Sequence, residues 1–222
     1  MFHPTDKPME RGWVGRIDVE QVTHLAAQTL QHFFSGGGGA REHAEYGLAD
    51  VTLLVPVLQP PTVRLFEDAE TLAFGNPTAV LGPGAAVPRV SSPLSAHGRL
   101  AAVIGAGGAI GGFSALVEWR GGGRGAKAND FGLVLGPLVA TDLDPDGLAF
   151  TLSRDGATEA SGLAGGFDWE AAIGLAAAGT ALRTGDVVAG PSVCVLDGIA
   201  DGALTLAVDG IGTLGCELVG PP

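Results

Sequence analysis

The chain has 222 residues, 46% of them hydrophobic, which fits one domain with a sizeable core. Its formal net charge is −12 and it has no basic cluster, which argues against nucleic acid or an anionic membrane surface as a partner. The 37 glycines follow no three-residue period, which excludes a collagen-like fibre.

Cys194 and Cys216 are the only cysteines, and the N-terminal segment has no secretory pattern. We therefore expect a reduced, cytoplasmic protein. No apolar run approaches the ~20 residues that span a bilayer, so no membrane segment is expected. Nothing near Cys194 in the sequence would lower the pKa of its thiol, which predicts a buried structural cysteine.

The N-terminal part is predicted to form an arm and a helix. Residues 1–17 are polar and predict an extended arm. From Asp18 to Phe33 apolar residues recur at helical spacing, and Asp18 with Gln21 resembles a capping box, which predicts a helix. Residues 51–58 predict a strand. We place a boundary near residue 60, with the N-terminal arm and helix in 1–60 and a β-rich domain in 61–222.

The middle of the chain predicts short strands separated by turns. Residues 62–66, 77–84 and 99–105 are the strand candidates. A second helix is predicted from Ile110 to Trp119, and a further strand from Phe131 to Val139.

The C-terminal part predicts mostly β structure. Leu148–Ser153 and the segment after Asp155-Gly156 form a predicted hairpin, because Asp-Gly favours a tight turn. Asp168 is the predicted N-cap of an alanine-rich helix. The residues after Gly185 alternate apolar and polar side chains between glycine turns. Helices do not alternate regularly with strands, so the expected fold class is a β-rich α+β protein and not a doubly wound sheet.

Several segments in this half match one known pattern in order. The stretch from Lys127 through Gly136-Pro137 to Thr141 resembles "K-x-x-D … GP-x-x-x-T", and it is followed by matching segments at 148–156, 185–188 and 209–214. The chain resembles the fumarylacetoacetate hydrolase and 2-keto-4-pentenoate hydratase superfamily, which includes 4-oxalocrotonate decarboxylase, as a divergent, shortened member. The resemblance implies a mixed β-roll or sandwich with a few external helices, a homo-oligomer, and a small carboxylic acid as substrate.

The same resemblance implies a metal site that this sequence has altered. In the superfamily an E-x-E pair and a third acid hold Mg²⁺ or Mn²⁺, which grips a 2-oxo acid. Here the pair reads His97-Gly98-Arg99, and the third position falls near Glu118. An arginine cannot donate a lone pair to a metal.

Three interpretations of this site are open. Glu118 and His97 could still hold a cation. Alternatively, Arg99 supplies the positive charge of the lost metal and pairs with Glu118 or with a substrate carboxylate, which we favour because guanidinium groups bind carboxylates well. In the third interpretation, His97 and Arg99 are merely exposed where a strand begins.

Other site residues follow from the resemblance. Lys127 stands where relatives carry a substrate-contacting lysine, with Asp130 beside it in the motif. Ser192 stands where hydratases have a hydroxyl residue, so Arg99, Lys127, Asp130 and Ser192 are the catalytic candidates. His97, Gly136 and Gly190 are expected to line the substrate site.

A rival motif lies between Val103 and Gly111, where the glycines resemble a dinucleotide-binding turn. Three functions are therefore considered. The first is a lyase, hydratase or C–C hydrolase that acts on a small 2-oxo or enol acid with an eroded metal site. The second is a non-catalytic relative that stabilises or regulates an active paralogue. The third is a dinucleotide-binding protein built on Gly105–Gly111.

Overall fold

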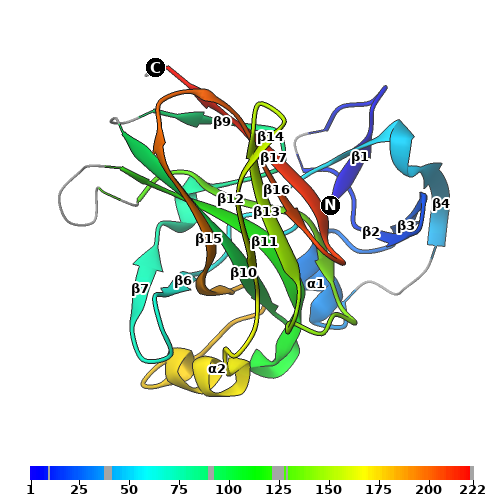
Figure 1. Cartoon of the computed structure of the whole chain (residues 1–222). Coiled ribbons are helices and arrows are strands. Elements are labelled where there is room, and N and C mark those ends of the chain that lie inside the picture. Colours follow the sequence, from blue (N-terminus) through cyan, green and yellow to red (C-terminus); the bar gives the residue numbers. More distant parts are fainter. Residues whose placement is uncertain (10, 38–41, 90–92, 122–127, 129, 221–222) are drawn as a thin grey trace.

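The computed structural model describes residues 1–9, 11–37, 42–89, 93–121, 128 and 130–220. Twelve strands form two sheets that curl around a common core (Figure 1). The larger sheet contains β6 (Val63–Phe66), β7 (Leu72–Gly75), β8 (Val80–Leu81), β10 (Leu94–Ile104), β11 (Ile110–Gly121), β12 (Leu133–Ala140) and β15 (Val187–Ile199). The smaller sheet contains β9 (Ala85–Pro88), β13 (Ala149–Arg154), β14 (Ala157–Leu163), β16 (Gly202–Val208) and β17 (Gly212–Val219).

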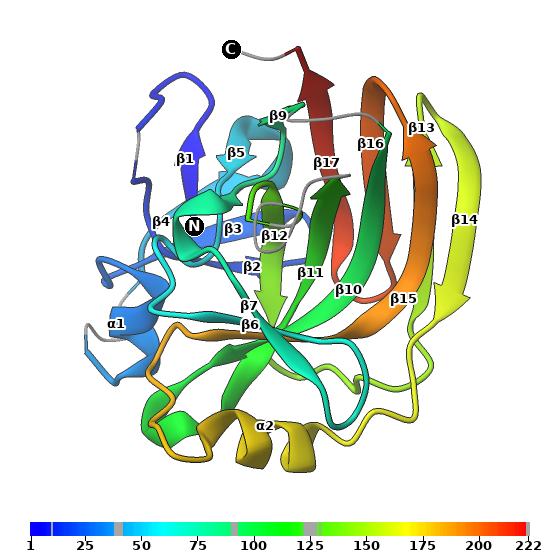
Figure 2. The same ribbon diagram turned by 90° about the vertical axis from the view of Figure 1, so that its left-hand side faces the viewer.

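The strand order of the two sheets places the long central strands side by side. The seven-stranded sheet has the order β7-β6-β15-β10-β11-β12-β8, and the five-stranded sheet has the order β14-β13-β16-β17-β9. In Figure 2, β15, β10 and β11 run next to one another through the middle of the molecule. The predicted β-rich α+β roll is confirmed.

The main core lies between the sheets, where Trp119 and Phe150 are fully buried. A second core covers the other face of the larger sheet and includes Leu65, Ala101 and Leu116. The central strands are therefore covered on both faces, and their apolar runs are nearly continuous.

Two local predictions in the C-terminal half are confirmed. The hairpin of β13 and β14 turns at Asp155 and Gly156, whose φ angles of 49° and 84° fit a tight primed turn. Helix α2 (Trp169–Ala177) begins after Asp168, whose carboxylate accepts a 2.9 Å hydrogen bond from the backbone N–H of Ala171. This helix lies across one end of the roll (Figure 2).

The predicted helix from Asp18 to Phe33 is wrong. The segment forms β2 (Gly15–Asp18), β3 (Gln21–Leu25) and the short helix α1 (Leu30–Phe34). Val19, at a positive φ of 53°, forms the turn between the strands and is exposed. The β-branched residues of β3 pair with β4 (Glu42–Gly47), so a partner distant in sequence overrides the helical spacing.

The predicted helix from Ile110 to Trp119 is also wrong, because these residues belong to β11. This strand pairs with β10 on one side and β12 on the other. A strand that is buried on both faces has apolar side chains at successive positions and does not alternate apolar with polar ones. Its sequence therefore resembles that of a buried helix.

The glycines of Gly105–Gly111 form the turn of the β10–β11 hairpin. The two strands are antiparallel, and Gly107 and Gly108 have φ angles of 66° and 82°. A dinucleotide-binding turn leads from a strand into a helix and on to a parallel strand. The segment does not have that structure, so the dinucleotide interpretation is wrong.

The described residues among the first 53 include helix α1 and two small sheets, which lie beside the roll (Figure 1). One pairs β1 (Phe2–Pro4) with β5 (Val51–Leu53), and the other contains β2, β3 and β4. The boundary near residue 60 remains a prediction. Within the described part of the chain, no helix has the length and apolar character needed to cross a membrane.

The packing of β14 against β15 depends on Gly162. A Cβ at this position would collide with the carbonyl oxygen of Val193, which is backbone and cannot rotate away. We expect Gly162→Ala to lower the free energy of unfolding by about 1–3 kcal/mol, the range for overpacked sites. Chemical denaturation followed by circular dichroism measures this change.

Gly174→Ala is the matched control, since Gly174 lies in α2 with open space around it. Alanine has the higher helix propensity, so this variant should gain up to about 1 kcal/mol. Equal stability of the two variants would contradict the predicted packing.

Candidate functional site

A polar cluster lies on the face of β10 and β11 that turns away from the main core. Ser95, His97 and Arg99 alternate along β10 and share this face. Across the β10–β11 ladder, Ser95 pairs with Arg120 and His97 pairs with Glu118. Side chains two residues apart on a strand point to the same face, so the paired strands bring the predicted residues His97, Arg99 and Glu118 together.

Arg99 is the centre of this cluster, and its side chain has no exposed surface. Its Nε donates to Oε2 of Glu118 at 2.7 Å, and Nη2 donates to Oε1 of Glu67 at 3.1 Å. Nη1 donates to the carbonyl oxygens of Phe66 and Gly190 at 2.6 and 2.8 Å. Four hydrogen bonds from one buried guanidinium fix its position.

Glu118 has no exposed side-chain surface either, and both of its oxygens accept hydrogen bonds. Oε2 accepts from Arg99, while Nε of Arg120 donates to Oε1 at 2.9 Å and its Nη2 donates to Oε2 at 3.1 Å. Arg120 also donates to Glu67, which links the cluster to the end of β6. Two arginines and two glutamates thus form a closed network.

The charges of this network balance. Burial raises the pKa of Glu67, but the hydrogen bond from Arg120 and the charges of Arg99 and Arg120 outweigh it and hold the pKa below its usual value. Burial lowers the pKa of Arg120, but its bonds to Glu118 and Glu67 raise it overall. The formal charges of the two arginines and the two carboxylates sum to zero.

These residues do not fit a divalent cation. Both oxygens of Glu118 already accept from guanidinium groups, and a cation bound there would face Arg99 and Arg120 at close range. The balanced network would also gain two uncompensated charges in a buried place, which is costly. Among the described residues, no group of three His, Cys, Asp or Glu side chains could hold a metal ion.

His97 is held between two serines. Its Nδ1 lies 3.0 Å from Oγ of Ser192, and its Nε2 lies 3.1 Å from Oγ of Ser95. Burial lowers the pKa of His97, and the charge of Arg120 adds to this effect. Both shifts favour the neutral imidazole, which has one nitrogen that donates and one that accepts.

A small hollow of about 150 Å³ meets the surroundings of this cluster only at Gly190 and Ser192, and it is also lined by Leu100, whose side chain packs in the main core. Ser192, Gly190, Phe167 and Trp169 are among its lining residues. The β10–β15 register shifts on both sides of Arg99, so the regular alternation of β15 is interrupted there. Gly190 therefore has neighbours on both faces of the sheet. Its carbonyl oxygen accepts a hydrogen bond from Arg99, and a Cβ at this position would lie 3.3 Å from Phe167 and Trp169.

The remaining predicted site residues lie elsewhere. Gly136 pairs with Ala115, and a Cβ there would press on Pro83, so packing in β12 explains this glycine. The backbone carbonyl of Asp130 accepts a 3.0 Å hydrogen bond from Asn76. Lys127 lies outside the described residues.

Cys194 is buried behind the cluster, as the sequence predicted. Burial raises the pKa of its thiol to about 11, so the reactive thiolate is scarce at neutral pH. Its sulfur packs against the position of Gly98, where a Cβ would approach it to 2.7 Å.

Sequence reasoning missed three members of the cluster. Ser95 and Arg120 each lie two residues from a candidate on the same strand, and that spacing was a usable signal. Glu67 comes from β6 and has no local signal, because only the fold brings it to Arg99.

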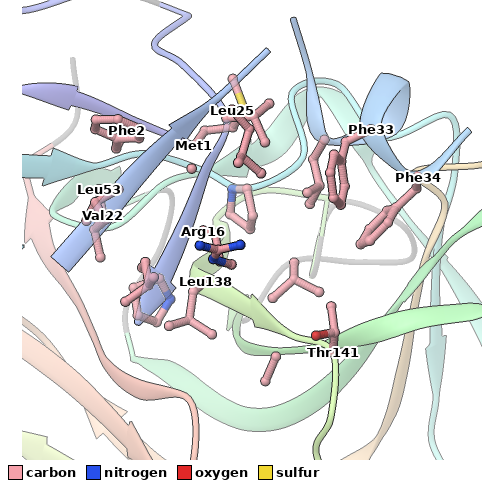
Figure 3. A pocket seen from close by; sticks show the side chains of 18 of the residues that line it. Met1, Phe2, Arg16, Val22, Leu25, Phe33, Phe34, Leu53, Leu138 and Thr141 are labelled. Carbon is pink, nitrogen blue, oxygen red and sulfur yellow. The ribbon is translucent and has the colours of Figure 1, made fainter. Parts of the chain in front are cut away.

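A larger hollow of about 610 Å³ lies between the N-terminal strands, α1 and the end of β12 (Figure 3). Apolar side chains such as Phe2, Leu25 and Phe33 line most of it, with the Arg16 side chain among them. It shares no lining residue with the polar cluster.

Comparison with family models and with curated protein sequences found no match. Solved structures, in contrast, match over nearly the whole chain. A 5-carboxymethyl-2-hydroxymuconate delta-isomerase from Mycobacterium smegmatis is 22% identical with a TM-score of 0.77, and the match covers 99% of this chain and 98% of that one.

Two further structures agree with this match. A 2-hydroxyhepta-2,4-diene-1,7-dioate isomerase from Mycobacterium marinum is 22% identical, with a TM-score of 0.77 and coverage of 94% and 93%. A maleylpyruvate hydrolase from Sphingobium sp. SYK-6, in complex with manganese(II) and pyruvate, is 19% identical, with a TM-score of 0.76 and coverage of 96% and 98%.

The chain shares the fold of these structures, which is the fold that the resemblance found in the sequence implied. The chain has the fold of the β-roll domain of the fumarylacetoacetate hydrolase superfamily.

The ion pair between Arg99 and Glu118 allows a direct test. Removing one partner of a buried pair costs about 3–5 kcal/mol, because the other charge stays buried. We expect Arg99→Met to lower the free energy of unfolding by this amount, and Arg99→Met with Glu118→Met to cost less than the sum of the single changes. Urea unfolding of the four proteins of this cycle measures the coupling.

Arg154→Met is the control, since Arg154 forms a partly exposed pair with Glu159. Such pairs contribute about 0–1 kcal/mol. Additive effects of the Arg99 and Glu118 changes would contradict the described network.

Proposed function

We propose that the protein is an enzyme that acts on a small 2-oxo or enol carboxylic acid without a bound divalent cation. The reaction is of the lyase or hydratase type or a C–C bond hydrolysis. The observation that carries this proposal is the buried Arg99 guanidinium, which lies among the groups that stand at the superfamily's metal-binding positions. The names of the structural neighbours, isomerases of unsaturated hydroxy carboxylic acids and a maleylpyruvate hydrolase, support the substrate class.

The two arginines have different roles in this proposal. Arg99 is fully buried, and its hydrogen bonds go to the protein, so it supplies a fixed positive charge. Arg120 is 27% exposed and presents the accessible edge of the network. A substrate carboxylate therefore binds at Arg120, because a guanidinium edge binds carboxylates through charge-assisted hydrogen bonds.

The other groups complete a small site. A hollow of about 150 Å³ is smaller than the roughly 300–1,000 Å³ of pockets for drug-sized ligands, which suits a compact acid. His97 and Ser192 supply a proton acceptor and a hydroxyl beside it. Lys127, in the motif that it shares with Asp130, remains a proposed substrate contact.

A non-catalytic relative is the second candidate. The closed, neutral network around Arg99 favours it, since such a network also stabilises a fold without any ligand. This protein would then stabilise or regulate an active paralogue. Turnover separates the two candidates.

The test is turnover in the presence of EDTA. Acylpyruvates and 2-hydroxypenta-2,4-dienoate are offered, and the decay of the dienol absorbance is followed. We expect turnover that EDTA does not abolish and that added Mg²⁺ or Mn²⁺ does not raise. Arg120→Met should raise KM about tenfold or more, since a hydrogen bond to a charged group contributes about 1.5–3 kcal/mol.

Arg154→Met is again the matched control, as it removes a surface arginine far along the chain from the cluster. No turnover of either substrate class, with or without metal, would contradict the proposed enzyme and favour the non-catalytic role.

A further inference from the structure

His97 and its two serines form a continuous chain of hydrogen bonds. Ser95 and His97 lie on β10, and Ser192 lies on β15, so two adjacent strands hold the chain in place. The Oγ–Nδ1 distance of 3.0 Å and the Oγ–Nε2 distance of 3.1 Å are both within hydrogen-bond range. All three side chains are only partly buried, so a reactant can reach them.

The chemistry of a neutral imidazole gives this chain a direction. One ring nitrogen donates and the other accepts. If Ser192 donates its hydroxyl proton to Nδ1, then Nε2 carries the hydrogen and donates to Ser95. Ser95 thereby orients the ring, and Nδ1 is the base toward Ser192. A nucleophile, a base within reach and a third group that orients the base is the arrangement of an activated serine.

The position of Ser192 also fits this role. The residue lines the small hollow together with Gly190 and the aromatic side chains of Phe167 and Trp169. The volume of about 150 Å³ restricts the acyl group to a small one.

We propose that Ser192 is a nucleophile activated by His97 and that the site hydrolyses small acyl compounds through an acyl-enzyme. The assignment of the acyl compound as an acylpyruvate rests on the proposed function, whereas the serine chemistry does not.

The proposed reaction consists of an acylation and a deacylation. Oγ of Ser192 forms a bond to the acyl carbonyl carbon, and its proton moves to Nδ1 of His97. The bond between the acyl carbon and the leaving group breaks, and the leaving group, a 2-oxo acid enolate in an acylpyruvate, takes that proton at carbon. Water then loses a proton to His97 and attacks the Ser192 ester. The acyl group leaves as a carboxylic acid, and Ser192 regains its proton.

Covalent labelling tests this proposal without any assumption about the carboxylate. The full-length protein is treated with a fluorophosphonate, which has no carboxylate, and the modified residue is located by peptide mass spectrometry. We expect one label, on Ser192, and none in Ser192→Ala. Because general bases contribute about 10²–10⁴-fold, His97→Gln should slow labelling at least 100-fold. Ser95→Ala should slow it by a smaller factor.

Ser161→Ala is the matched control, since Ser161 is an exposed strand serine of β14 and should not affect labelling. Thermal melts establish that each variant is folded, and the wild-type result stands even if a variant fails. Failure to label Ser192 in the wild type, or equal rates in folded His97→Gln, would overturn the proposal.

The two proposals fail in different ways. Labelling of Ser192 without turnover of any 2-oxo acid contradicts the proposed substrate class and supports the serine chemistry. Turnover of a 2-oxo acid that persists in Ser192→Ala supports the proposed function and overturns the nucleophile.

Discussion

The ion pair between Arg99 and Glu118 is the interaction on which the rest of the site depends. Both side chains are fully buried, on adjacent strands of a sheet covered on both faces. Such charges are tolerated only when each is paired and its remaining donors and acceptors are satisfied. The carbonyls of Phe66 and Gly190 and the side chains of Glu67 and Arg120 meet that requirement, which ties β6, β10, β11 and β15 together.

This ion pair also determines which ligands the carboxylate of Glu118 can still bind. A hard cation needs free carboxylate oxygens, and here guanidinium groups occupy those of Glu118. In our proposals, the positive charge becomes a fixed part of the protein, and the reactive groups become His97 and Ser192. The same proposals assign acid–base and nucleophilic chemistry to this β-roll in place of Lewis-acid activation.

The sequence predicted what local chemistry controls. Asp155-Gly156 and Asp168 act within their own turns, so their predictions are confirmed. The helices predicted at 18–33 and 110–119 are wrong because pairing with distant strands decides those segments. The same contrast between local and distant contacts holds for the site. The i, i+2 spacing of His97 and Arg99 is visible in the sequence, whereas only the tertiary structure brings Glu67 into contact with Arg99.

The most direct test of the account is a titration of the metal-free protein with Mn²⁺, followed by electron paramagnetic resonance of the free ion. We predict that the wild-type protein leaves the signal of free Mn²⁺ unchanged at Mn²⁺ concentrations that saturate an ordinary carboxylate site. Stoichiometric loss of that signal, abolished by Glu118→Gln, would contradict the claim that Arg99 has taken the place of the metal.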